Sequence, residues 1–132
     1  MGLSTRYGPW RLTAAVAAGM WVLVVIWTSL APLDPDATPL LPISDKWLHA
    51  LAYAVLGFLV TLAMRTRRPV LVMCSIIVLG LALEIVQGQT GYRTYDLIDL
   101  LADAVGAFGG ILAATGLLEL AARRTVPPDA GH

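Results

Sequence analysis

Ionisable and polar residues recur at helical spacing in three segments of this chain that are otherwise apolar. Spacings of three and four residues place side chains on one face of a helix. The residues concerned are Lys46, His49, Tyr53, Glu84, Gln87, Arg93, Asp96, Asp99 and Asp103. A charge at membrane depth costs at least about 2.5–3.5 kcal/mol, so such a set is a candidate binding or catalytic site.

Three kinds of chemistry fit these residue types. Lys46 and Arg93 could clamp an anion such as a phosphate or carboxylate head group. His49 and the carboxylates of Glu84, Asp96, Asp99 and Asp103 could hold a divalent metal or act as general acid and base. The same groups could also relay protons or ions. The spacing does not separate these possibilities from a purely structural ion-pair network, because neither an HExxH motif nor a cysteine pair is present.

The rest of the sequence predicts a membrane protein that is all helical. Of the 132 residues, 58% are hydrophobic and 14% are charged, and the mean hydropathy is +0.74. A helix needs about 20 apolar residues to cross the hydrocarbon core. Four segments meet this requirement, near residues 10–31, 47–64, 70–88 and 96–122. We therefore expect a single domain over residues 1–132, a bundle of four transmembrane helices followed by a disordered tail at 125–132.

The arginines predict the orientation of this bundle. Short cytoplasmic loops collect Lys and Arg, and most arginines fall on the side of the chain termini. Both termini should then be cytoplasmic, and the polar stripes should converge in a pocket that opens to the outside. Below this pocket, Gly106, Gly110 and Ala114 are spaced for close helix packing.

The arrangement of these motifs resembles that of the VanZ-like family. The resemblance is carried by Asp45-Lys46-Trp47-Leu48-His49-Ala50-Leu51-Ala52-Tyr53, Leu56-Gly57-Phe58, Glu84-Ile85-Val86-Gln87 and Arg93-x-x-Asp96-x-x-Asp99-x-x-x-Asp103-x-x-Gly106. It implies a small multi-pass protein of the bacterial cytoplasmic membrane, in a family named after an accessory determinant of teicoplanin resistance. The characteristic polar residues that it implies are Asp45, Lys46, His49, Tyr53, Glu84, Gln87, Arg93, Asp96 and Asp99. The family usually has Asn where this chain has Asp103, and the resemblance supplies no reaction.

Three functional hypotheses follow from these observations. The leading one is a non-enzymatic envelope protein that binds an anionic lipid or cell-wall precursor head group and alters susceptibility to glycopeptide-type antibiotics. The second is a membrane-embedded enzyme acting on a lipid-linked substrate, with His49, Glu84 and Asp99 as acid, base or metal ligands. The third is a scaffold for partner membrane proteins. The expected partners are the lipid bilayer and such membrane proteins rather than nucleic acid, and the pattern assigns no cofactor.

Overall fold

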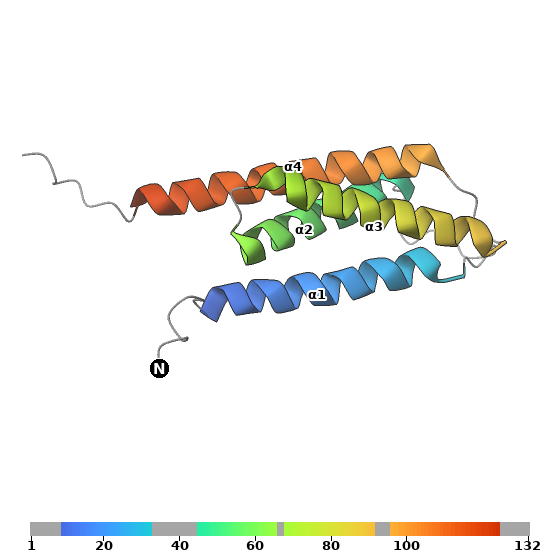
Figure 1. Cartoon of the computed structure of the whole chain (residues 1–132), viewed down its shortest axis with the longest axis horizontal. Helices are drawn as coiled ribbons and strands as arrows, with labels where there is room; N and C mark the ends of the chain where they lie inside the picture. Colours follow the sequence, from blue (N-terminus) through green and yellow to red (C-terminus); the bar gives the residue numbers. More distant parts are fainter. Residues whose placement is uncertain (1–8, 33–44, 66–67, 92–95, 125–132) are drawn as a thin grey trace, which may run out of the picture.

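The computed structural model describes residues 9–32, 45–65, 68–91 and 96–124, and these form four α-helices (Figure 1). They are α1 (Pro9–Leu30), α2 (Asp45–Met64), α3 (Pro69–Gln89) and α4 (Leu97–Arg124). Each is long and apolar enough to cross a membrane. The predicted all-helical fold with four spans is therefore confirmed, and the predicted boundaries differ from these by at most two residues. The predicted tail at 125–132 lies outside the described residues.

Local sequence explains several of the helix ends. Pro69 opens α3, where its fixed φ suits the first turn and its missing N–H costs nothing. Asp96 is the N-cap of α4, because its Oδ1 accepts a hydrogen bond from the Ile98 amide at 2.8 Å. The side chain of Asp45, the first residue of α2, lies outside the described part of the chain.

Helices α2 and α4 form the closest pair in the bundle and run parallel (Figure 1). A Cβ at Gly106 or Gly110 would overlap the backbone carbonyl oxygen of Ala50 or Ala54, and one at Gly57 would lie 2.6 Å from the Ala107 carbonyl oxygen. The two backbones are therefore in direct contact, which confirms the packing role predicted for the glycines. The main contact therefore joins two helices that α3 separates in the chain, while helices that are neighbours in sequence also contact each other.

Helix α3 completes the core with one buried face. Its buried residues are Val72, Ile76, Gly80, Leu83, Glu84 and Gln87. The other faces of all four helices carry exposed large apolar side chains, including Leu23, Leu51, Val78 and Phe108. In a soluble protein such an extensive apolar surface would be unusual, so these faces are the ones that contact lipid.

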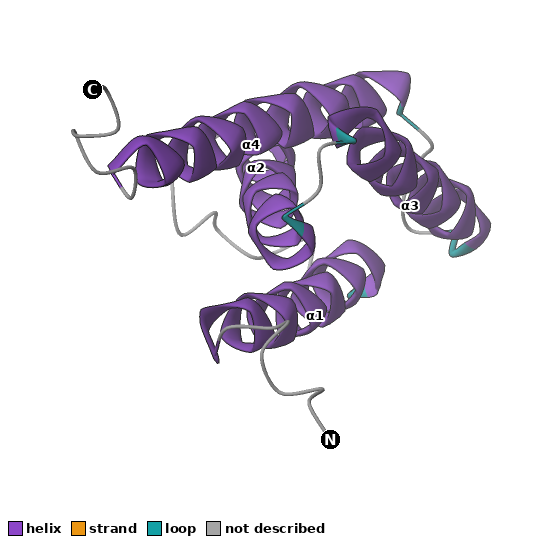
Figure 2. Ribbon diagram, turned by 60° about the vertical axis from the view of Figure 1, so that its left-hand side comes forward, coloured by secondary structure: helices purple, strands orange, loops and turns teal. Residues whose placement is uncertain are grey.

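Helix α1 lies beside α2 (Figure 2) and is attached to it by polar contacts near its N-terminal end and in its middle. At one end, the Arg11 guanidinium donates to the carbonyls of Ala63 and Met64, each at 3.3 Å. In the middle, the Trp21 indole donates to the Ala52 carbonyl at 2.8 Å. The last carbonyls of a helix lack intrahelical partners, so Arg11 stabilises the C-terminus of α2 while it positions α1.

Candidate functional site

The polar residues meet where α2 and α4 begin, and the outermost group is an ion-pair bridge. The Lys46 Nζ lies 2.9 Å from Asp96 Oδ2 and 3.0 Å from Asp99 Oδ1. The Lys46 side chain is 45% exposed and that of Asp99 is 16% exposed. One ammonium thus joins the start of α2 to the first turn of α4 and remains accessible from outside the bundle.

Asp96 connects this bridge to the backbone of α4 and to the Glu84 side chain of α3. One carboxylate oxygen caps α4 and the other accepts from Lys46, while the Asp96 amide donates to Glu84 Oε2 at 3.2 Å. The hydrogen bond from Lys46, together with that from the Ile98 amide, lowers the pKa of Asp96 below its usual value of 3.8. The buried Glu84 therefore ties α3 to the start of α4.

This lowered pKa predicts an acid-dependent loss of stability. Because the folded-state pKa lies below the unfolded one, the stabilisation from ionised Asp96 is complete above the unfolded value and is lost as pH falls through the folded value. We expect thermal unfolding of the protein in detergent to shift downwards in this acidic range. Asp96→Asn keeps an N-cap but loses the ion pair, so its unfolding temperature should vary less over the same range. Equal slopes for the two proteins would contradict this prediction, and Glu119→Gln on an exposed part of α4 is the control.

A second group lies one to two turns deeper and is almost closed to the surroundings. His49 Nδ1 is 3.0 Å from Asp103 Oδ1, with side-chain exposures of 12% and 4%. The Tyr53 hydroxyl also forms a hydrogen bond with the Asp103 carboxylate, and Tyr53 is 2% exposed. The absence of a side chain at Gly80 leaves room for Asp103 Oδ2 and the Tyr53 hydroxyl against α3. Asp103 therefore acts as the common partner of His49 and Tyr53.

The structure thus brings together most of the residues expected from the sequence, with two exceptions. Gln87 lies apart from the ion pairs, because its Nε2 donates to the Ser29 carbonyl at the end of α1, at 2.8 Å. Arg93 lies outside the described residues. Among the residues that are described, no group of three or more His, Cys, Asp or Glu side chains is placed to hold a metal ion.

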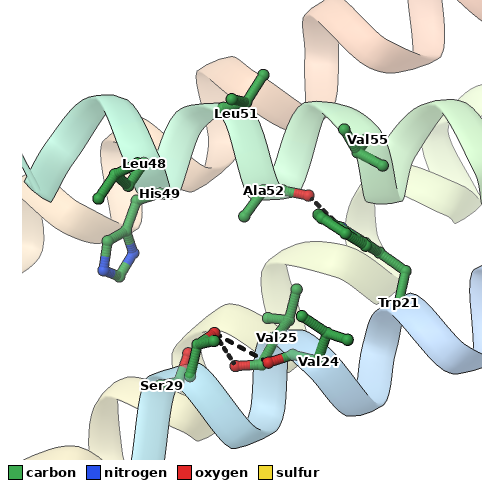
Figure 3. Close-up of a pocket in the computed structure, with 10 residues that line it drawn as sticks. Trp21, Val24, Val25, Ser29, Leu48, His49, Leu51, Ala52 and Val55 are labelled. Atoms are coloured by element: carbon green, nitrogen blue, oxygen red, sulfur yellow. Dashed lines mark hydrogen bonds between the residues drawn. The ribbon is translucent and has the colours of Figure 1, made fainter. Parts of the chain in front are cut away.

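The ion-pair bridge and the deeper group together form a polar cluster of Lys46, His49, Tyr53, Glu84, Asp96, Asp99 and Asp103. A groove of about 550 Å³ lies between α1 and α2, and His49 of this cluster is one of its lining residues (Figure 3). We had expected a polar pocket among the stripes, whereas this groove is mainly apolar and one wall comes from α1. Its lining residues are Trp21, Val24, Val25, Thr28, Ser29, Leu48, His49, Leu51, Ala52 and Val55. Sequence reasoning missed the contribution of α1 because that helix has no polar stripe. Trp21, placed far from the membrane interfaces where Trp is enriched, was the available signal.

The four spans and the buried polar cluster define a multi-pass membrane protein. The family model described as VanZ/LLP1 matches residues 15–119, which include all of α2, α3 and the polar cluster. The chain therefore belongs to the VanZ/LLP1 family, as the resemblance of its motifs had predicted. No curated protein and no solved structure matches it.

Proposed function

We propose that this protein binds an anionic lipid or lipid-linked cell-wall precursor by its head group, at the end of the bundle where α2 and α4 begin. With both termini in the cytoplasm of a bacterium, this end faces outwards from the cytoplasmic membrane. Binding there would alter the access of glycopeptide-type antibiotics to envelope precursors.

The observation that carries the proposal is that the accessible Lys46 ammonium lies above the buried group of His49, Tyr53 and Asp103. Asp96 and Asp99 hold Lys46 in one position, so little side-chain entropy is lost when it contacts a ligand. An ammonium has three donors, and the two carboxylates account for two of them. Arg93, three positions before Asp96 in the sequence, is proposed as the second cation of the clamp. Its planar guanidinium suits a phosphate group.

This proposal predicts that Lys46→Gln weakens retention of an anionic lipid. A hydrogen bond to a charged group contributes about 1.5–3 kcal/mol, so the apparent affinity should fall by about 10-fold or more. Native mass spectrometry of the purified protein titrated with phosphatidylglycerol measures this change. Phosphatidylcholine serves as the competing lipid without net charge. Arg124→Gln, an exposed change at the far end of α4, is the control. Equal retention of phosphatidylglycerol by the Lys46→Gln variant and the wild type would overturn the proposal.

A second candidate function, a membrane-embedded enzyme, is favoured by the His49–Asp103 contact. A carboxylate on Nδ1 orients an imidazole and stabilises it when protonated, as a general base requires. His49 would take a proton from the water or hydroxyl that attacks an ester or phosphodiester of a lipid-linked substrate, and return that proton to the leaving oxygen. In this scheme Asp103 orients His49, and Glu84 and Asp99 remain candidates for a further acid or base. Cleavage of such a lipid, abolished by His49→Gln while the lipid is still retained, would establish the enzyme; lipid retention with no cleavage by the wild type would exclude it.

A further inference from the structure

The groove between α1 and α2 is suited to hold part of a lipid as well as to border the polar cluster. Its volume of about 550 Å³ falls within the range of about 300–1,000 Å³ typical of small-molecule sites. Val24, Leu48 and Leu51 on its wall are 45%, 44% and 63% exposed, so the groove is accessible from the lipid-facing surface of the helices. A ligand can therefore enter it sideways from the bilayer.

The groove is polar at the end near the polar cluster and apolar at its deeper end, as a lipid is polar at its head group and apolar along its chains. Ser29 and His49 line the end near the polar cluster, whereas Trp21 and Val55 line the deeper end (Figure 3). At about 1.5 Å per residue, Trp21 lies roughly 14 Å below the end of α1, and Val55 lies roughly 15 Å below the start of α2. The groove therefore covers the depth at which the first part of an acyl chain follows its head group.

Two hydrogen bonds set the spacing of α1 in this region. The Trp21 indole is fixed to the Ala52 carbonyl at the deep end, and the Ser29 carbonyl is fixed to Gln87 at the other. The wall from α2 includes the small side chain of Ala52 near the deep end. This arrangement keeps room for an additional apolar group between the two helices.

We propose that the groove holds the upper part of one acyl chain of the lipid whose head group is bound at the polar cluster. The inference rests on the proposed head-group site and adds to it a site for the acyl chain of the same lipid. His49 makes the two parts continuous, because it lines the groove and contacts Asp103 in the cluster. Lipid selection comes from the head group, since moving a chain from bilayer to groove exchanges one apolar environment for another. The groove determines where the chain lies.

The test is photo-cross-linking of the full-length protein with phosphatidylglycerol that carries a diazirine near the carbonyl end of one acyl chain. Cross-links in the wild type should concentrate on residues 21–29 and 48–55. Ala52→Phe and Val24→Phe each fill the groove from a different helix, and each should reduce these cross-links several-fold. Ala113→Phe adds the same ring to an exposed position of α4 and should leave them unchanged. Using two filling variants guards against a folding defect in one of them.

The outcomes separate this inference from the proposed function. Cross-links spread evenly over the lipid-facing helices, or unaffected by both filling variants, would overturn the groove inference even if Lys46→Gln abolishes lipid retention. Cross-links confined to the groove but equal for phosphatidylglycerol and phosphatidylcholine probes would support the acyl-chain site and overturn the anionic head-group site. Confined cross-links that need both Lys46 and an open groove support the two together.

Discussion

Replacing Gly110 by Ala should unfold or severely destabilise this protein. A Cβ at that position would overlap the Ala54 carbonyl oxygen and approach the Phe58 nitrogen to 2.9 Å. Backbone atoms cannot move aside as a flexible side chain can, so α2 and α4 would have to separate along the whole interface. Overpacking of a core typically costs about 1–3 kcal/mol, and we expect about 3 kcal/mol or more here. The effect is measured by thermal unfolding in detergent, with the loss of monodisperse protein as the readout.

The chain provides a matched control for this substitution on the same helix. A Cβ at Gly109 or Gly116 would meet nothing within 4 Å. Gly109→Ala should therefore leave stability unchanged or raise it by about 0.5–1 kcal/mol, because Ala loses less backbone entropy in a helix. If Gly109→Ala and Gly110→Ala were equally stable, the contact between the α2 and α4 backbones would be wrong.

The second large effect is expected from Asp103→Ala. This change removes the common partner of His49 and Tyr53 in a region where Asp103 itself is 4% exposed. Removing one partner of a buried pair costs about 3–5 kcal/mol, because the remaining polar group stays buried without compensation. Asp103→Asn keeps an oxygen acceptor at the same place and should cost far less, in keeping with the Asn that the family usually has there.

A double-mutant cycle measures how much of this effect belongs to the pair. Once Asp103 is replaced by Ala, changing His49 to Ala as well should add little further destabilisation. The losses in unfolding free energy of the two single variants should therefore sum to more than the loss in the double variant. Unfolding of the four proteins under one set of conditions gives the coupling. Strict additivity would mean that the 3.0 Å contact between His49 and Asp103 does not stabilise the fold.

Much of the fold could be predicted because membrane-spanning helices follow from local composition. The length of each apolar run determines a span, and the spacing of Gly106 and Gly110 marks a helix-packing face. The partner of that face could not be predicted in the same way. Which helix packs against α4 depends on a register between distant segments, and the sequence pattern of α2 alone does not contain it.

The candidate site shows the same division. The stripes on α2 and α4 indicated which residues would face each other, and Lys46 does pair with Asp99 and His49 with Asp103. The sequence did not determine which carboxylate pairs with which residue of α2. Asp99 and Asp103 lie on the same stripe of α4, and the choice between them depends on how far α4 is shifted along α2. Gln87 shares the periodicity of Glu84, yet it satisfies a carbonyl at the end of α1, a requirement set by where another helix stops.

The parallel pairing of α2 with α4 has a consequence for how the protein is made. Because α3 lies between them in the chain, α2 enters the membrane before α4 has been synthesised. At that stage the partners of Lys46 and His49, and the glycines that pack against α2, do not yet exist. At about 5–20 residues per second, the roughly 45 residues from the end of α2 to Gly110 take about 2–9 s to appear. During this interval the polar face of α2 lacks the Asp99 and Asp103 partners that it has in the folded protein. Biogenesis, like stability, therefore depends on α4 arriving with its glycines and carboxylates in register.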